Sequence, residues 1–198
     1  MVNKRKKAGG HIYRSITIGS QTWLFENLRT THYRNGDTIA NVTDSTQWCI
    51  IQSGAYCDYG NQPANVETYG RLYNWYAVTD SRNIAPEGYH VAGYSEWQDL
   101  KIFLGAGDDV GAMLKETGTA HWISPNNATN ASGFTALPSG LRNDNGSYVN
   151  LGLYCNFWNT QQAGVSQAYG FSLSFSETVF AENVFFKRNG LAVRCIKD

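Results

Sequence analysis

The sequence predicts a single α+β domain, and three observations support this class. Aromatic residues make up 14% of the chain, charged residues only 16%, and glycine occurs 20 times. This composition favours short strands and turns over a bundle of helices. Residues 95–105 have the apolar spacing of an amphipathic helix, and from about residue 132 short β-like runs alternate with Gly, Asn and Ser. We therefore expect a mixed, mostly antiparallel twisted sheet with two helices and long loops.

The domain is expected to span residues 12–198, preceded by a flexible basic tail over residues 1–11 that contains Lys4, Arg5, Lys6 and Lys7. Sixteen acidic residues balance sixteen basic ones, so the formal net charge is zero. This balance argues against steering toward nucleic acid or an anionic membrane. No window approaches the roughly 20 apolar residues of a membrane span. We predict neither a nucleic-acid partner nor membrane insertion.

The first half of the domain mixes clear and irregular segments. Strands are expected at residues 15–18 and 22–24, joined by the turn-forming pair Gly19-Ser20. Residues 41–68 are expected to form a long surface loop, because they are rich in Asn, Gly, Gln and Pro. Residues 69–77 place aromatic and apolar side chains at helical spacing, which predicts a short helix.

The clearest local signal lies between residues 86 and 105. A turn at Pro86-Glu87-Gly88 precedes a strand at Tyr89–Val91, in which His90 is expected to be a buried core residue. Ser95 is the expected N-cap of the following helix, and Gly105 its end. A short helix is expected over residues 110–116. The apolar face of the first helix would comprise Trp97, Leu100, Phe103 and Leu104.

No catalytic or metal-binding constellation stands out in the sequence. The four histidines are scattered, and no nucleophile elbow, phosphate loop or dinucleotide fingerprint is present. The cysteines form no CxxC pair; Cys49 and Cys57 flank a short loop and are either bridged or free thiols. Residues 143–146 match part of a calcium loop but lack the distal bidentate Glu. We therefore predict no catalytic residue, no metal ligand and no cofactor.

Several stretches resemble a known family: TIGSQTWLFENL, YGRLYNWYAV, APEGYHVAGYSEWQDL, SGFTALPSGLR and GLAVRCIKD. In this order they are similar to the Fibrobacter succinogenes major paralogous domain, over about residues 12–198. The resemblance implies a C-type lectin-like fold, in which a mixed sheet and two helices lie under a loop-rich ligand face. It also implies a secreted, cell-surface or virion protein without a known reaction. The chain departs from the family at Ala92-Gly93, where a Pro usually follows His-Val.

A subset of this family resembles the chain more closely: the variable proteins of diversity-generating retroelements. Such proteins display a hypervariable C-terminal segment whose codons mutate at adenines, often in Asn codons. Randomised Asn codons cannot yield Gln, Glu, Lys, Met or Trp. Residues 140–157 contain none of these five types, and Gly170 and its neighbours also fit. The resemblance implies a variable ligand-binding segment at about residues 140–187.

The physical pattern of this segment also favours a binding surface. Odd positions from Val149 to Phe157 are apolar and alternate with Tyr and Asn, so one face of the strand is expected to be buried and the other exposed. Tyr offers a large contact area at low entropic cost, and Asn adapts its hydrogen bonds, as in antibody loops. The predicted ligand-binding residues are Leu141, Asn143, Asp144, Tyr148, Asn150, Leu153, Tyr154, Asn156, Phe157, Phe171, Ser172, Ser174, Phe175 and Phe185.

The resulting expectation is a non-catalytic display domain that binds a protein or cell-surface ligand, including a glycan, through aromatic anchors. Two alternatives stay open at this point. One is an enzyme or a calcium-dependent lectin; in the lectin, a sugar ring stacks on Trp158 or Tyr154 while Asn and Asp side chains ligate the ion. The other is a surface adhesion module.

Overall fold

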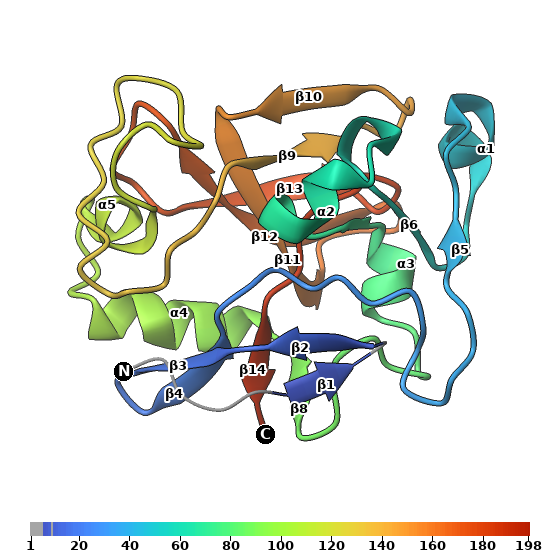
Figure 1. Ribbon diagram of the computed structural model, residues 1–198, viewed down its shortest axis with the longest axis horizontal. Coiled ribbons are helices and arrows are strands. Elements are labelled where there is room, and N and C mark those ends of the chain that lie inside the picture. Colours follow the sequence, from blue (N-terminus) through green and yellow to red (C-terminus); the bar gives the residue numbers. More distant parts are fainter. Residues whose placement is uncertain (1–5, 9) are drawn as a thin grey trace.

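The computed structural model describes residues 6–8 and 10–198, and it is an α+β structure built from four sheets and short helices. Figure 1 shows the largest sheet across the upper part of the molecule and a smaller sheet below it, with the longest helix beside both. The predicted class is therefore confirmed. Strands pair largely antiparallel, and parallel pairing joins β9 (Ser139–Arg142) to β11 (Tyr154–Gln162) and β5 (Ala40–Asn41) to β6 (Ala55–Cys57).

The largest sheet has five strands in the order β10-β9-β11-β12-β13. Its central strands β11 and β12 are long, and Phe157 lies opposite Phe171 in their register. β13 forms one edge and β10 the other. The strands are β9 (Ser139–Arg142), β10 (Tyr148–Leu151), β11 (Tyr154–Gln162), β12 (Gln167–Ser174) and β13 (Ala181–Phe186).

A four-stranded sheet in the order β3-β4-β14-β8 brings the two ends of the domain together. The predicted hairpin is confirmed, with Ile16 opposite Trp23, and the C-terminal Ile196 pairs with Trp23 from the other side. Two small sheets complete the strands, in the orders β5-β6-β7 and β1-β2. Their bounds, with those of the four-stranded sheet, are β1 (Lys6–Ala8), β2 (His11–Tyr13), β3 (Ser15–Ile18), β4 (Gln21–Leu24), β5 (Ala40–Asn41), β6 (Ala55–Cys57), β7 (Leu72–Tyr73), β8 (Tyr89–Val91) and β14 (Cys195–Lys197).

Among the helices of the described chain, α4 is the longest, at ten residues. The two helices expected after residue 94 are present as α4 and α5, although α5 is only five residues long. None of the helices in the described part of the chain has the length and apolar character that a bilayer span requires. The helices are α1 (Ser45–Ile50), η1 (Tyr59–Asn61), α2 (Ala64–Tyr69), α3 (Trp75–Val78), α4 (Tyr94–Phe103) and α5 (Val110–Leu114).

Trp97 of α4 is the centre of an aromatic core between the two larger sheets. Its ring lies 4.6 Å from that of Trp23 on β4 and stacks at 5.2 Å on that of Phe157 on β11. Phe134 and Phe180 approach it from the connecting loops, at 5.8 and 5.6 Å. Pairs of this geometry contribute about 0.5–1.5 kcal/mol each beyond the area that they bury. The core therefore joins α4 to both sheets.

The single helix predicted over residues 69–77 is wrong. Gly70 adopts a φ of 75° and ends α2, Leu72 and Tyr73 form strand β7, and only then does α3 begin. The Asn74 side chain accepts the Ala77 N–H at 3.0 Å and so caps α3. The aromatic spacing that suggested one helix comes from residues of three separate elements, of which Leu72, Tyr73 and Ala77 are buried and Tyr69 and Tyr76 half-buried.

The long loop predicted over residues 41–68 is also wrong. Asp44 accepts the Gln47 N–H at 2.8 Å and starts α1, and β6, η1 and α2 follow. Each element is six residues or fewer, so hydrophobic periodicity is too short to reveal it. Trp48 of α1 is fully buried and anchors this segment in the interior.

Helix α4 begins two residues earlier than an N-cap at Ser95 would allow. The Glu96 carboxylate accepts the Gly93 N–H at 2.6 Å, so Gly93 is the cap. Trp97 and Leu100 are buried as predicted, whereas Phe103 is 61% exposed.

Two further expectations concern the N-terminus and the cysteines. Lys6–Ala8 forms strand β1 and pairs with β2, so the flexible tail predicted over residues 1–11 is wrong for this part. Its residues 1–5 and 9 lie outside the described structure. All four cysteines are free thiols, and Cys49 and Cys57 are not bridged. Burial raises the pKa of the Cys57 thiol to about 11.

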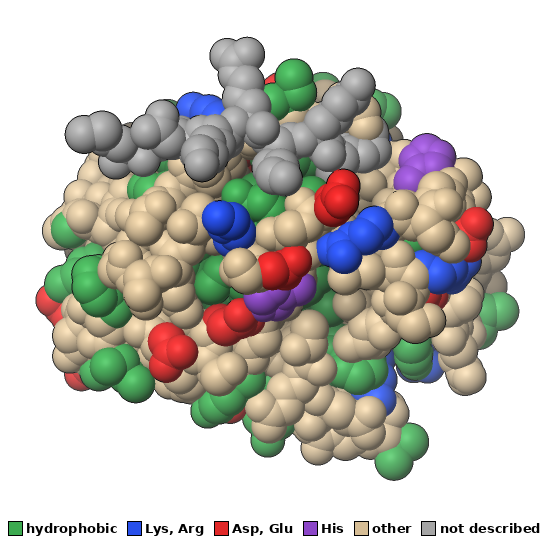
Figure 2. Space-filling view, turned by 90° about the horizontal axis from the view of Figure 1, so that it is seen from below, with side chains coloured by type: hydrophobic (Ala, Val, Ile, Leu, Met, Phe, Trp, Pro, Cys, Tyr) green, Lys and Arg blue, Asp and Glu red, His purple; other side chains and the backbone are tan. Residues whose placement is uncertain are grey.

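His90 does not lie in the core, as the sequence suggested, but joins two carboxylates at the surface. Its Nδ1 lies 2.8 Å from Asp198 and its Nε2 lies 2.5 Å from Glu96. Figure 2 shows a histidine flanked by acidic side chains on this face. Burial lowers the pKa of His90, but the hydrogen bonds to Asp198 and Glu96 outweigh it, so the pKa is raised above its ordinary 6.5.

This raised pKa predicts a pH-dependent stability. The contribution of His90 is fully present below the unfolded-state pKa and is lost as the pH rises through the folded-state value. Because the His90 side chain is 38% exposed, solvent limits the effect to about 1 kcal/mol or less. Urea unfolding across pH 5.5 to about 8.5 should show this loss in the native chain and not in His90→Gln. Equal pH slopes in both proteins would contradict the assignment.

Candidate functional site

The candidate site lies on strands β11, β12 and β13, whose two faces differ. Cys155 and Phe157 of β11 and Phe171 and Leu173 of β12 point into the aromatic core around Trp97. Successive residues of a strand point to opposite faces, so the residues between them form the other surface. In register across this second face lie Tyr154 opposite Ser174, Asn156 opposite Ser172, and Ser172 opposite Ala181.

The second face is hollowed into a cavity of about 270 Å³. Its wall combines one aromatic ring, two serine hydroxyls, an amide, a carboxylate and two small apolar side chains. The lining residues are Tyr154, Ser172, Ser174, Glu177, Val179, Ala181 and Asn183. Such a set offers hydrogen-bond donors and acceptors next to an apolar surface, as ligand pockets commonly do.

The floor of this face contains unused hydrogen-bonding capacity. The Ser172 hydroxyl donates to the Asn156 Oδ1 at 2.7 Å. The Asn156 Nδ2 is buried and has no hydrogen-bond partner among the residues that the structure describes. Buried polar groups are normally paired, so this amide is an uncompensated donor next to Ser172.

Lys115, which follows α5, holds the rim of the cavity in place. Its fully buried ammonium group donates to the carbonyl oxygens of Ser174 at 2.8 Å and Glu177 at 2.7 Å. The ring of Trp122 lies 5.4 Å from the same nitrogen. Burial lowers the pKa of Lys115. The segment from Ser174 to Glu177 is therefore fixed by a buried cation rather than by regular secondary structure.

Five of the predicted ligand-binding residues are buried, which corrects their assignment to a ligand-binding surface. Phe157 and Phe171 belong to the aromatic core around Trp97. Leu141 packs in a second core cluster, which contains Tyr73 and Trp158. Asn156 is 3% exposed and Ser172 is 8% exposed, although Ser172 still lines the cavity. Trp158, the ring proposed for sugar stacking, is fully buried and donates its Nε1–H to the Tyr73 carbonyl at 2.7 Å.

The other nine predicted residues are half-buried and do not form one surface. Tyr154 and Ser174 line the cavity, whereas the Phe185 ring packs on Trp158 at 5.8 Å and Phe175 packs against the core around Trp97. The remaining five lie on or beside the β9–β10 hairpin, and no cavity described here includes them: Asn143, Asp144, Tyr148, Asn150 and Leu153.

The segment that matched part of a calcium loop forms a tight turn between β9 and β10. The Asn143 N–H donates to the Ser147 carbonyl at 2.8 Å, and the Asn145 side chain accepts the Ser147 N–H at 3.0 Å. Asp144 lies 3.8 Å from Arg188. Within residues 6–8 and 10–198, no group of three or more His, Cys, Asp or Glu side chains is placed to hold a metal ion.

The sequence reasoning missed four cavity residues: Glu177, Val179, Ala181 and Asn183. Ala181 and Asn183 alternate along β13 and are in register with Ser172 and Gly170, a pairing that only the sheet establishes. The period of two along a strand was the signal available in the sequence, because it places residues 181, 183 and 185 on the same face of β13. Glu177 and Val179 reach the cavity because Lys115 folds their loop over it.

The comparison with family models decides the family. The model of the Fibrobacter succinogenes major domain matches residues 16–197. The chain belongs to this family. The match confirms the resemblance seen in the sequence and covers the four-stranded sheet, the aromatic core and the cavity alike. Searches of curated proteins and of solved structures returned no significant match.

Gly170 fits the codon pattern of a variable position, but its surroundings predict intolerance to change. A Cβ at this residue would lie 2.6 Å from the Phe157 carbonyl oxygen and 3.0 Å from the Phe185 ring. We expect Gly170→Ala to lower the free energy of unfolding by about 1–3 kcal/mol, as overpacking does. Gly164→Ala is the matched control, since nothing lies within 4 Å of its Cβ. Equal urea midpoints for both variants would contradict this steric account.

Lys115→Met should destabilise the protein and loosen the rim of the cavity. The substitution keeps an unbranched side chain but leaves the carbonyls of Ser174 and Glu177 without their donor. The expected loss is about 1–3 kcal/mol in urea unfolding. Lys101→Met, at a half-buried position on α4, is the control and should have little effect. Faster amide hydrogen exchange around residues 174–177 would report the loosened rim; unchanged exchange would refute the role of Lys115.

Proposed function

We propose that this protein is a non-catalytic ligand-binding display domain that uses the cavity on β11, β12 and β13. Its fold would be the C-type lectin-like one, and its variable segment would resemble that of a retroelement-diversified protein. The mixed sheets, the helix α4 packed beneath them and the many short loop elements are compatible with that fold. The ligand is a protein or cell-surface molecule, including a glycan.

One observation carries the proposal: the two faces of the same strands have independent environments. Phe157, Phe171 and Leu173 build the core, while Tyr154, Ser174 and Asn183 line the cavity on the other side. A change at a cavity position therefore leaves the core packing untouched, because alternate side chains of a strand do not share a face. A scaffold of this kind tolerates many different binding surfaces.

The chemistry of the cavity supports recognition more than catalysis. Tyr154 supplies a ring with a hydroxyl, and Asn183 supplies an amide that donates and accepts. Ser174 lies on β12, the strand between those of Tyr154 and Asn183. Its Oγ is 3.3 Å from the Oγ of Ser176, so the two hydroxyls are hydrogen-bonded to each other. Tyr, Ser and Asn together make up the adaptable contact surface of antibody loops.

Two libraries of variants test whether the cavity positions can change independently of the core positions. Randomising Tyr154, Ser174 and Asn183 should leave most members folded, because these side chains do not contribute to the aromatic core. Randomising Phe157, Phe171 and Leu173 should unfold most members, since large-to-small core changes cost about 2–5 kcal/mol each. The readout is the fraction of surface-displayed clones that resist protease.

The first library should also yield binders to a test protein such as hen lysozyme, and the second should not. If neither library yields binders, or if the core library folds as well as the cavity library, the display proposal fails. The retroelement origin is tested separately in the flanking DNA. It requires a near-identical repeat of the segment encoding residues 140–187 that differs only at adenines.

A further inference from the structure

A second cavity, of about 320 Å³, has the buried Arg194 in its lining. It shares no lining residue with the cavity of the proposed display face. Five segments that are distant in sequence meet there: the start of β3, the end of β4, α2, the chain after α5 and the residues before β14. The residues that define it chemically are Arg14, Glu26, Glu67, Glu116, His121 and Arg194.

The cavity runs from an exposed mouth to a buried floor. At the mouth, the Glu67 side chain is 87% exposed and pairs with Arg29 at 2.7 Å. At the floor, Arg194 is 2% exposed. Its Nη2 makes one long contact, 3.5 Å to the Thr135 carbonyl, so this nitrogen retains donor capacity where the guanidinium meets the cavity.

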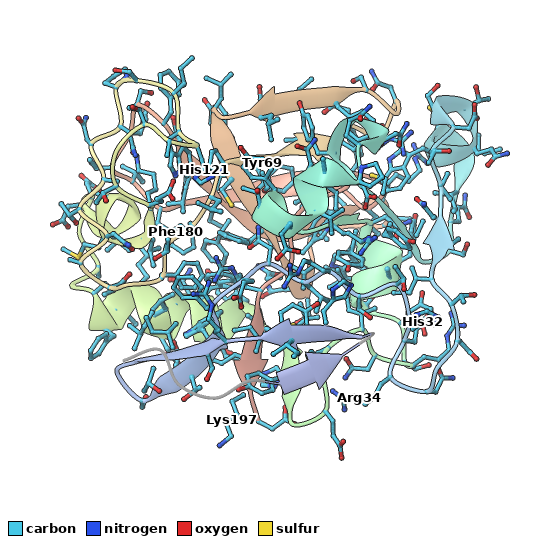
Figure 3. All side chains as sticks on the ribbon, viewed as in Figure 1. His32, Arg34, Tyr69, His121, Phe180 and Lys197 are labelled. Atoms are coloured by element: carbon cyan, nitrogen blue, oxygen red, sulfur yellow. The ribbon has the colours of Figure 1, made fainter. Side chains whose placement is uncertain are left out.

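One wall carries an oriented imidazole. Both carboxylate oxygens of Glu116 lie near the His121 Nδ1, at 3.0 and 2.8 Å. Because an ionised carboxylate only accepts, Nδ1 carries the proton of this contact, and Nε2 is the ring nitrogen left to pair with a ligand. Within the part of the chain that the structure describes, Nε2 has no hydrogen-bond partner. The Tyr69 ring meets His121 edge-on at 5.9 Å, and Figure 3 shows the two side chains beside each other.

Another part of the wall is formed by the ion pair between Arg14 and Glu26. The Arg14 Nε lies 2.6 Å from Glu26, whose second oxygen accepts the Arg14 backbone N–H at 2.9 Å. The Arg14 guanidinium covers the Phe25 ring at 4.3 Å, so an apolar surface adjoins the charged pair. Phe25 and Leu137 supply the apolar part of the lining.

The charges around this cavity cancel, which identifies the kind of ligand. The carboxylates of Glu26, Glu67 and Glu116 are matched by the guanidinium groups of Arg14, Arg29 and Arg194. An anion or a cation would meet no net attraction. A hydroxyl both donates and accepts, so a molecule with several hydroxyls can pair with alternating carboxylate, imidazole and guanidinium groups.

We propose that this cavity binds a small neutral polyol, the size of a single sugar residue, without a metal ion. Its volume lies at the lower end of the range for ligand pockets, which suits one ring better than a chain. His121 and Glu26 accept from ligand hydroxyls, and the Arg194 Nη2 donates to one. The site makes no contact with the cavity on β11–β13, so either proposal can fail without the other.

The test uses the full chain, saturation-transfer NMR and five probes in EDTA: glucose, galactose, mannose, fucose and N-acetylglucosamine. At least one probe should receive transfer. His121→Gln removes the imidazole that accepts from the ligand, and Glu116→Gln removes the carboxylate that orients it. Each should weaken sugar binding about tenfold, roughly the effect of losing one hydrogen bond. Two positions are changed so that a folding defect in one variant does not decide the result; thermal melting identifies such a defect.

Glu96→Gln is the matched control, because Glu96 also pairs with a histidine but lies in the surface cluster of His90. It should bind the sugar as the native chain does. Transfer to none of the five probes, undiminished binding by both cavity variants, or a requirement for added calcium would each overturn the proposal. Glycine and glutamate are added in a parallel measurement as charged comparison ligands. Transfer to either of them with none to a sugar would overturn the assignment to a neutral polyol.

Discussion

Buried cations that are solvated by backbone carbonyls hold this structure together. Arg194 is completely enclosed and donates to carbonyl oxygens of Leu24, Phe25 and Phe134, and to the Asn27 side chain. Burial lowers its pKa to about 10. Lys115, Arg142 and Lys187 repeat the arrangement, each on carbonyls and against an aromatic ring. Within the described chain, none of these four cations lies within ion-pair distance of a carboxylate. Glu26 acts on Arg194 only from a longer distance, where its charge raises the pKa of the guanidinium. Desolvating a charge is costly unless it is hydrogen-bonded, so these contacts define where each loop must lie.

This constraint explains how a chain with so little regular structure keeps a defined shape. Arg142 donates to the carbonyls of Val42 and Thr43 and joins the β9–β10 hairpin to the segment before α1. Lys187 donates to the Val165 carbonyl and fixes the turn between β11 and β12. The aromatic core around Trp97 supplies the apolar stabilisation, while the cations decide which loop packs where. A loop without strand or helix hydrogen bonds still needs partners for its carbonyls, and these cations supply them.

The aromatic core around Trp97 and the buried cations also shape both cavities. The aromatic core around Trp97 occupies one face of β11 and β12. On the opposite face Trp158 and Ala168 are buried in a second core cluster, and Lys115 fixes the loop of Glu177 beside the part that stays open. Arg194 ties the ends of β4 and the Phe134 loop together, and the second cavity forms where those segments meet α2. Both sites are thus rigidly framed by buried groups that do not themselves need to vary. Preorganisation of this kind reduces the entropic cost of binding.

The sequence by itself determined the class, the family, the hairpin of β3 and β4, and the helix α4, because each rests on contiguous periodicity or on several ordered motifs. It also indicated that Cys155 and Phe157 face inward. Only the tertiary structure decided that Asn156, Phe171 and Leu141 are buried, that residues 69–77 divide into three elements, and that Asn183 joins Tyr154 in one cavity. Sequence period shows which residues share a face of one strand. It does not show what covers that face, since the cover comes from loops and buried cations that are distant in the chain.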